Sequence, residues 1–378
     1  MTATSAPLGD LAAITSGFAF KSSEFNTTGD GLPLIRIRDV VSGRSETFYS
    51  GDFKPDHVIE NGDALIGMDG EFNLAKWRGG RALLNQRVCK VEAKDERLNQ
   101  EYLVRLLPKA LKEIEARTPF VTVKHLSVKE LRAVEIPLPP LPEQRRIAAI
   151  LDQADALRAK RRAAIAKCDQ LLQSVFLEMF GDPVTNPQGW PTHTLGDLVK
   201  FTGGSQPAKK YFTDTPAPDR VRLVQIRDFR TDKYPTYIPK ELARRPFTRK
   251  DVMVGRYGPP VFQIFRGLEG SYNVALMKAE PKSMLDTEFL FHLLKNDSIQ
   301  RAVISNSQRS AGQSGVNLDF LSGLTIGTPP IELQQRFANS ASALQFQVDR
   351  LEAQSSRISE FFSALQQRAF TGQLSPAA

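Results

Sequence analysis

The sequence contains few of the residues that usually carry chemistry. Its 378 residues include only two cysteines, Cys89 and Cys168, and four histidines. Two cysteines so far apart exclude a disulfide framework and a cysteine-rich zinc site, and the histidines lack metal-ligand spacing. No apolar run approaches the roughly 18 residues that span a bilayer, so we expect no membrane contact and a cytoplasmic location.

The short motifs of common enzyme classes are also missing. The sequence has no GxxxxGK[ST] phosphate loop, no GxGxxG dinucleotide loop, no HExxH zinc motif and no GxSxG nucleophile elbow. Asp56, Glu92 and Lys94 have the residue types of a nuclease site, but such spacings arise by chance in a charged chain. We therefore expect a binding protein without catalysis of its own, and a nuclease is the less favoured alternative.

The charge balance is basic without being decisive. There are 50 Lys and Arg against 42 Asp and Glu, which gives a formal net charge of +8. This permits a polyanionic partner but does not identify one. Each local basic cluster is as consistent with a solvated face as with phosphate contact. The clusters are Lys76, Arg78 and Arg81; Lys209 and Lys210; and Arg244, Arg245, Arg249 and Lys250.

The most informative feature is an internal repeat. Matching segments are separated by about 190 residues along most of the chain, which indicates two copies of one unit. A period this long predicts a whole domain in each copy. The clearest matches are Leu8-Gly-Asp-Leu11 with Leu195-Gly-Asp-Leu198, Ile37-Arg-Asp39 with Ile226-Arg-Asp228, Asn85 with Asn273, and Gln144 with Gln334.

Each copy divides into a head and a long helix. We predict α+β heads at residues 1–141 and 182–329, and helices at 142–181 and 330–378. Alternation predicts strands over Leu32–Arg38 and Val221–Arg227. Amphipathic spacing predicts short helices over Glu101–Leu107 and Glu288–Leu294.

The two long helices have heptad spacing, which is typical of a coiled coil. No Pro or Gly occurs from Glu143 to Phe180, and such a helix is on the order of 57 Å long at about 1.5 Å per residue. The short connection after the first helix favours antiparallel pairing, with the heads held apart about a pseudo-two-fold axis. The predicted seam residues are Ile147, Ile150, Leu157, Leu171, Phe337, Leu344, Leu351, Ile358 and Leu365.

The pattern resembles the specificity subunit of type I restriction-modification enzymes. The resemblance covers the whole chain and is carried by Ile136–Ile147, by the Leu-Gly-Asp-Leu start of each head and by Gln366–Leu374. It implies that each head is a target recognition domain reading half of a split site in double-stranded DNA. It also implies two modification subunits that use S-adenosylmethionine to methylate adenine, with or without restriction subunits. No cofactor is expected on this chain.

Loops that differ between the copies are the candidate DNA contacts, because two different half-sites require different side chains on one scaffold. Residues 69–78 are matched with 257–266, and 118–125 with the segment from Gln308 to Ser314. An interaction scaffold whose heads bind protein is the alternative from another class. The candidate DNA-binding residues are Arg38, Lys76, Arg78, Thr122, Lys124, Arg227, Tyr257, Gln263, Arg309, Ser310 and Gln313.

Overall fold

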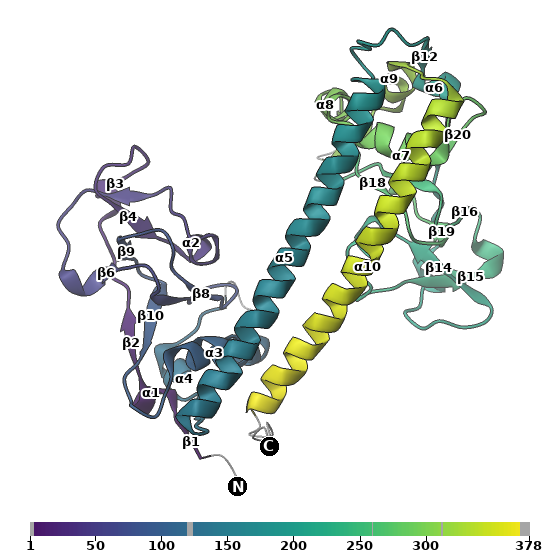
Figure 1. Ribbon diagram of the computed structural model, residues 1–378. Helices are drawn as coiled ribbons and strands as arrows, with labels where there is room; N and C mark the ends of the chain where they lie inside the picture. Colours follow the sequence, from purple (N-terminus) through teal and green to yellow (C-terminus); the bar gives the residue numbers. More distant parts are fainter. Residues whose placement is uncertain (1–3, 119–123, 259, 311–312, 371–378) are drawn as a thin grey trace. The chain divides into compact units, whose positions relative to one another are not determined.

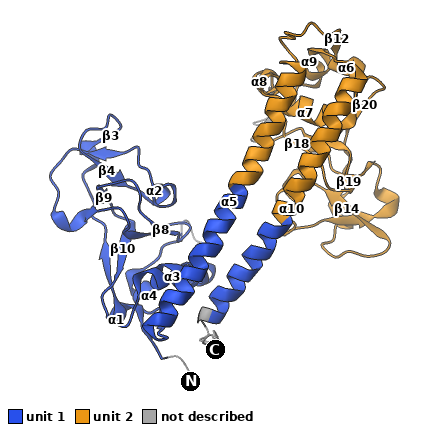
Figure 2. Ribbon diagram, viewed as in Figure 1, with its two compact units in different colours: residues 1–162, 353–378 blue, residues 163–352 orange. Residues whose placement is uncertain are grey.

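The computed structural model describes residues 4–118, 124–258, 260–310 and 313–370 (Figure 1). The chain forms two compact units, one of residues 1–162 with 353–378 and one of residues 163–352 (Figure 2). The boundary between the units falls inside two long helices, α5 (Leu141–Phe180) and α10 (Ile331–Phe370). One part of each helix belongs to the first unit and the other part to the second. No helix in the described residues is long and apolar enough to cross a membrane.

The first head contains two main sheets. One is antiparallel with strand order β2-β10-β7-β8, and the other has order β3-β5-β4-β9-β6. The elements are β1 (Ser5–Pro7), α1 (Leu8–Leu11), β2 (Ala12–Ser16), β3 (Phe25–Asn26), β4 (Leu32–Ile35), α2 (Ile37–Ser42), β5 (Phe48–Tyr49), β6 (Val58–Ile59), β7 (Ala64–Gly67), β8 (Leu74–Lys76), β9 (Ala82–Leu84), β10 (Val88–Ala93), α3 (Gln100–Arg117), α4 (Val128–Arg132) and β11 (Glu135–Pro137).

The second head has the same plan. Its antiparallel sheet has order β13-β20-β17-β18, and a second sheet has order β15-β14-β19-β16. The elements are β12 (Thr192–Thr194), α6 (Leu195–Leu198), β13 (Val199–Gly203), β14 (Arg220–Val224), β15 (Tyr237–Pro239), β16 (Pro246–Phe247), β17 (Val252–Gly255), β18 (Ile264–Phe265), β19 (Gly270–Tyr272), β20 (Leu276–Pro281), α7 (Thr287–Lys295), α8 (Asp297–Ser305), β21 (Gln308–Ser310), β22 (Gln313–Gly315), α9 (Leu318–Gly323) and β23 (Thr325–Gly327).

The repeat is visible in the register of these sheets. The only parallel pairs among the described strands are β4 with β9 and β14 with β19. Leu34 lies opposite Leu83 in the first pair, and Leu223 lies opposite Ser271 in the second. The two heads therefore share one mixed α+β fold, which confirms the predicted fold class. Each Leu-Gly-Asp-Leu motif is a single helical turn, α1 or α6, whose two leucines are fully buried.

A close backbone approach explains the shared asparagines. A Cβ on Gly17 would lie 2.0 Å from the Asn85 carbonyl oxygen, and one on Gly204 would lie 1.9 Å from that of Asn273. Both asparagine side chains are largely buried, and each accepts a hydrogen bond within its own turn. The Asn85 side chain accepts from the N–H of Gln86, and the Asn273 side chain accepts from the N–H of Ala275. Their role is structural, because each side chain stabilises its own turn.

The predicted strands over Leu32–Arg38 and Val221–Arg227 end early. After β4 and β14 the chain turns into α2 and into a 3-10 turn at Ile226–Phe229. The cause is a cap that the alternation does not reveal. The Asp39 carboxylate accepts from the Arg36 N–H at 2.9 Å, and Asp228 accepts from the Gln225 N–H at 2.8 Å.

The head helices are longer than predicted. The first predicted helix stops before Pro108, whereas α3 continues through this proline to Arg117. In the second head α7 ends at Lys295, and Asn296 caps a new helix, α8. Burial of eight α3 side chains against the head holds the helix across Pro108, because tertiary packing outweighs local propensity.

Each long helix begins with a buried glutamine that joins it to a head. Gln144 accepts from the Asn99 N–H at 2.8 Å and donates to the carbonyls of Arg97 and Pro139 at 2.7 and 2.9 Å. Asn99 is the N-cap of α3, so this glutamine fixes the start of α5 against the start of α3. The Gln144 side chain is fully buried with all three bonds made.

The two helices are antiparallel, as predicted. In the first unit Arg158 of α5 lies 5.2 Å from the ring centroid of Phe362, near the end of α10. In the second unit Phe176 and Phe180, near the end of α5, both lie 5.5 Å from the ring of Phe337, near the start of α10. The α5 bounds, Leu141–Phe180, are within one residue of the predicted 142–181.

The seam prediction for α5 is wrong at two of its four residues. Leu157 and Leu171 are 42% and 49% exposed, and Ile150 is only half-buried. The buried stripe includes Ile147 as predicted but then steps by four rather than three. Its other members are Leu151, Ala154, Arg158, Arg161, Ile165, Cys168, Leu172 and Phe176, buried or half-buried.

The same shift applies to α10 and makes its stripe more apolar. All five predicted residues, Phe337, Leu344, Leu351, Ile358 and Leu365, are buried or half-buried. Between these residues the buried or half-buried stripe contains Ala341, Val348, Ser355 and Phe362. Each of them follows directly after the position that the predicted spacing selects, and those selected positions are polar or exposed. Adjacent apolar pairs such as Leu171 and Leu172 satisfy both spacings, so the sequence leaves the choice open.

Candidate nucleic-acid interface

The divergent loops of the first head lie side by side. The N–H of Gly70 donates to the Lys124 carbonyl at 2.9 Å, and the N–H of Leu126 donates to the Met68 carbonyl at 2.7 Å. Asp69 and His125 form an isolated β-bridge between these bonds. Two segments that the sequence analysis selected separately therefore form one surface.

The second head brings its divergent loops together in the same way. The N–H of Val316 donates to the Arg256 carbonyl at 2.9 Å, and Tyr257 forms an isolated bridge with Gly315. Gly315 ends the β21–β22 hairpin, in which Arg309 faces Ser314 and Ser310 faces Gln313. The paired loops occupy equivalent backbone positions in both heads, and we call each pair the loop junction of its head.

The side chains at the two junctions differ in chemistry. In the first head the Asp69 carboxylate lies 2.6 Å from Nδ1 of His125 and 3.5 Å from Nε of Arg87. In the second head Tyr257 replaces this carboxylate, and the Arg256 guanidinium lies 5.2 Å from its ring centroid. One junction thus has an ionic cluster, and the other has an exposed aromatic ring beside a cation.

Gln263 lies close to the second junction. Its Oε1 accepts a hydrogen bond from Arg230, and its Nε2 donates to the Pro260 carbonyl at 2.9 Å. These bonds hold the amide in one orientation on a half-buried side chain. The position fits the predicted role, although both ends of the amide already have partners.

Lys76 lies in strand β8 and not in a loop as predicted. Its ammonium group forms an ion pair with Glu101 on α3. Arg266 forms the corresponding ion pair with Glu288 on α7, at 2.5 Å. This shared pair belongs to the scaffold, so it does not distinguish one half-site from another.

The ion pairs also correct the matching of residues 69–78 with 257–266. Leu74 lies opposite Ile66 in the first sheet, and Ile264 lies opposite Val254 in the second. Lys76 is therefore the counterpart of Arg266, a role that the sequence matching gave to Arg78. The loop of the second head is two residues longer, so an ungapped comparison misplaces this strand, and the original offset returns by Leu83 and Ser271.

The remaining candidates have different surroundings. Arg78 is exposed and has no hydrogen bond or ion pair within the described residues. Lys124 donates to the Glu115 carbonyl at the end of α3. Thr122 lies outside the described residues. For Arg309, Ser310 and Gln313 the structure gives the backbone of the hairpin only.

Arg38 and Arg227 each lie beside the aspartate that follows them. Their Nε atoms are 3.7 and 3.9 Å from Asp39 and Asp228, and both arginine side chains are more than half exposed. A local ion pair is therefore present in both heads. The exposed guanidinium faces are accessible to a phosphate, and DNA contact by these arginines stays a prediction.

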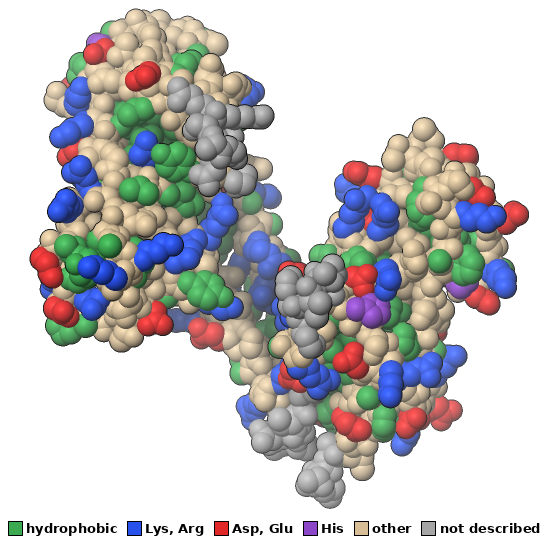
Figure 3. Space-filling model, turned by 180° about the vertical axis from the view of Figure 1, so that it is seen from behind, with side chains coloured by type: hydrophobic (Ala, Val, Ile, Leu, Met, Phe, Trp, Pro, Cys, Tyr) green, Lys and Arg blue, Asp and Glu red, His purple; other side chains and the backbone are tan. Residues whose placement is uncertain are grey.

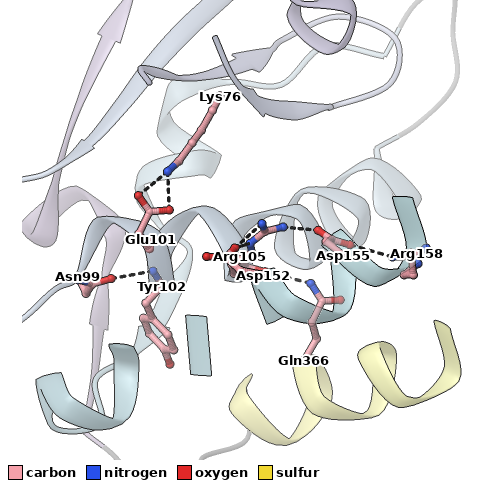
Figure 4. A network of polar contacts seen from close by, with 9 residues as sticks. All are labelled: Lys76, Asn99, Glu101, Tyr102, Arg105, Asp152, Asp155, Arg158 and Gln366. Atoms are coloured by element: carbon pink, nitrogen blue, oxygen red, sulfur yellow. Dashed lines mark hydrogen bonds and ion pairs between the residues drawn. The ribbon is translucent and has the colours of Figure 1, made fainter. Parts of the chain in front are cut away.

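Polar contacts join the first head to both long helices (Figure 4). The Arg105 guanidinium on α3 binds Asp152 and Asp155 of α5, while its carbonyl accepts from Nε2 of Gln366 at 3.0 Å. Sequence patterns do not predict this network, because its members are far apart in the chain. Repeated charge at Asp152 and Asp155 on one helical face was the available signal.

Burial and partners control ionisation near the second head's scaffold pair. Burial opposes charge on the Glu288 carboxylate, yet hydrogen bonds from His292 and Arg266 lower its pKa to about 2. Burial lowers the pKa of His292, and the neighbouring Arg266 and Lys295 add to this effect against the pull of Glu288. At neutral pH the site is an arginine–carboxylate pair beside a neutral imidazole.

Charge alone does not locate a binding surface. Lys and Arg side chains lie across the visible faces, interspersed with Asp and Glu (Figure 3). The informative feature is the contrast between the two loop junctions on one shared scaffold. The chain thus carries two heads of one fold that present different side chains at equivalent loops.

The comparisons with known proteins agree. The family model for the type I restriction modification DNA specificity domain matches residues 3–167 and again 187–356. The chain therefore belongs to the type I restriction-modification specificity family, and DNA sequence recognition is its function. This confirms the resemblance found in the sequence.

Known relatives and solved structures cover nearly the whole chain. The type I restriction enzyme EcoBI specificity subunit of Escherichia coli is 29% identical, over 96% of this chain and 84% of the relative. The MjaVIII specificity subunit of Methanocaldococcus jannaschii is 20% identical, over 84% and 80%. The S subunit structure from M. genitalium has a TM-score of 0.57 at 14% identity and covers 99% of this chain and 96% of that one.

A second solved structure, from work on complex assembly and conformational transition of the type I R-M system, has a TM-score of 0.53 at 18% identity. It covers 99% of this chain and 98% of that chain. At these identities the structures bear on the fold, which agrees with the α+β heads and long helices described above.

Proposed function

We propose that each head reads one half of a split, asymmetric site in double-stranded DNA. The chain acts as the non-catalytic subunit that places two modification subunits on this site. Those subunits bind S-adenosylmethionine and methylate adenine, and restriction subunits join some assemblies. The proposal goes beyond family membership in its stoichiometry, its cofactor and its assignment of one half-site to each head.

One observation carries the assignment of half-sites. The loop junctions lie at equivalent backbone positions, with a Met68–Leu126 hydrogen bond in one head and an Arg256–Val316 bond in the other. Their side chains are an ionic cluster in one head and an aromatic ring in the other. Contacts to phosphate are alike for every sequence, whereas base edges differ, so divergent side chains on a common backbone are suited to reading different bases.

The multi-subunit role is supported by the relatives. The EcoBI relative is a specificity subunit of a restriction enzyme, and one structural relative comes from work on complex assembly. The long helices offer exposed apolar side chains for such partners, including Leu157, Leu171, Leu177, Phe346 and Phe361.

The test is to assemble the full chain with modification subunits of its system and to sequence the methylated adenines. We expect a two-part site with unequal halves. Exchanging the loop junction segments between heads should exchange the half-site sequences while the spacing is kept. Methylation that follows no two-part sequence would contradict the proposal.

The same preparation separates the two alternatives. A protein-binding scaffold predicts no duplex binding that weakens with salt. A nuclease acting through Asp56 and Glu92 predicts magnesium-dependent cleavage by the isolated chain. Either result, in place of sequence-dependent methylation, would replace the proposed function.

A further inference from the structure

We propose that Arg87 reads a guanine in the half-site of the first head and that Asp69 positions it. This inference rests on the proposed function, because it assigns a base contact within one head's half-site. Arg87 was not among the residues selected from the sequence. The structure places it at the loop junction, in contact with Asp69 and His125.

Arg87 occupies a scaffold position that both heads share. The N–H of Met68 donates to the Arg87 carbonyl at 2.8 Å, and the N–H of Arg256 donates to the Ala275 carbonyl at the same distance. The two carbonyls are thus placed alike, but the side chains are a guanidinium and a methyl group, and of the two residues only Arg87 has a positive φ. Such a position changes base preference without changing the fold.

The backbone at Arg87 is unusual for a residue with a side chain. Its φ is +72°, in the left-handed region that non-glycine residues seldom adopt. Such conformations persist where the surroundings hold them, and they concentrate at functional sites. The bond from Met68 holds this conformation, and the side chain remains 54% exposed.

The contacts of Asp69 determine which N–H groups of Arg87 remain available to bind a base. Nδ1 of His125 lies 2.6 Å from Oδ1 of Asp69, so Nδ1 carries the proton and donates it to the carboxylate. The 3.4 Å approach of Arg87 to the same Nδ1 is then a contact and not a second hydrogen bond. Oδ2 of Asp69 lies 3.5 Å from Nε of Arg87, which orients the guanidinium and leaves its N–H groups free to donate.

A planar set of free donors fits guanine better than the other bases. The major-groove edge of guanine offers two acceptors, O6 and N7, that match the arginine fork. Phosphate is a poorer fit here because Asp69 repels an anion beside Arg87. The second head lacks both groups, since Tyr257 and Ala275 stand in their places, so its half-site should be read by other contacts.

The experiment uses the complete assembly with a panel of duplexes that carry single-base changes at two salt concentrations. Arg87→Lys keeps the charge but loses the planar fork, and Asp69→Asn keeps the shape but loses the orienting charge. For Arg87→Lys we expect discrimination at one guanine of one half-site to fall by about tenfold to a hundredfold. Asp69→Asn should weaken the same position less, with an unchanged melting temperature.

The matched control is Arg97→Lys. Arg97 is exposed, lies in the same head and pairs with Asp95 at 2.8 Å, but it lies outside the loop junction. We expect it to leave base preference unchanged. Tyr257→Ala should affect the other half-site only.

Two results overturn the inference while leaving the proposed function intact. One is a specific complex in which Arg87→Lys and Arg87→Ala relax no guanine position. The other is a uniform loss of affinity in Arg87→Ala with a flatter salt dependence, which would identify a phosphate contact. Absence of sequence-specific binding by the parent assembly would overturn the proposed function itself.

Discussion

Gln144 and Gln334 make the same three hydrogen bonds in the two halves of the chain. Gln334 accepts from the Asp286 N–H at 2.9 Å and donates to the carbonyls of Met284 and Pro329 at 3.0 and 2.8 Å. Asp286 is the N-cap of α7, as Asn99 is of α3. The head–helix joint is therefore built identically twice.

Replacing Gln144 with alanine should destabilise the first unit by about 3 kcal/mol. The change leaves the Asn99 N–H and two carbonyls without their partner at a partly buried joint, and each unmade bond costs roughly 1–3 kcal/mol when buried. Denaturant unfolding measures the loss. Gln153→Ala, at an exposed position of α5, is the control and should cost less than about 0.5 kcal/mol. Equal losses would contradict the role of the joint.

Leu151→Ala should cost about 2–5 kcal/mol, whereas Leu157→Ala should cost much less. Leu151 is fully buried where α5 meets the first head's core, and Leu157 is 42% exposed. The same chemical change at the two positions isolates burial as the cause. Unfolding midpoints of both variants give the comparison. A larger loss for Leu157 would restore the seam that the heptad spacing predicted.

Lys76→Met should leave base preference unchanged. The Lys76–Glu101 pair has its counterpart in Arg266–Glu288, so it maintains the scaffold that both heads share. We expect at most about 1 kcal/mol of lost stability, because the pair is partly exposed to solvent. Methylated-site sequencing of the assembled variant is the measurement, and relaxation at any base position would return Lys76 to the reading surface.

Acid should weaken the second unit in two stages. The lowered pKa of His292 means that the unfolded chain binds its proton first, so stability falls as pH drops below about 6.5. The pKa of Glu288 is lowered to about 2, so its contribution is complete above about 4.5 and is lost between there and 2. Unfolding free energy against pH measures both.

Glu288→Gln is the variant for this pH dependence. It should remove the lower stage, because the amide does not titrate, and it should reduce stability at neutral pH. Glu241→Gln, in an exposed turn of the same unit, is the control. An unchanged acid profile in Glu288→Gln would show that other carboxylates govern it.

The sequence was sufficient for the features that repeat. Matching motifs predicted two heads, and unbroken heptad spacing predicted both ends of α5 and the start of α10 to within one residue. It failed where a choice depended on three-dimensional packing. Heptad spacing does not separate Leu171 from Leu172, because only the packing of α5 shows which one is buried.

The candidate interface was predictable only in part. Divergence between copies selected the loops that meet at Asp69 and Tyr257. It missed Arg87 because its importance comes from Asp69 and His125, which are distant in the chain. It misplaced Lys76 because an insertion of two residues in the second head shifts the comparison.

The hydrogen bond from Gln366 to the Arg105 carbonyl joins residues 261 positions apart. The second unit is one continuous stretch, residues 163–352, whereas the first is assembled from both ends of the chain. During synthesis the ribosome releases the first head long before the end of α10 that packs against it. The first unit therefore begins to fold first but is completed last. Until the end of α10 has been synthesised, part of the apolar surface of the first head stays exposed.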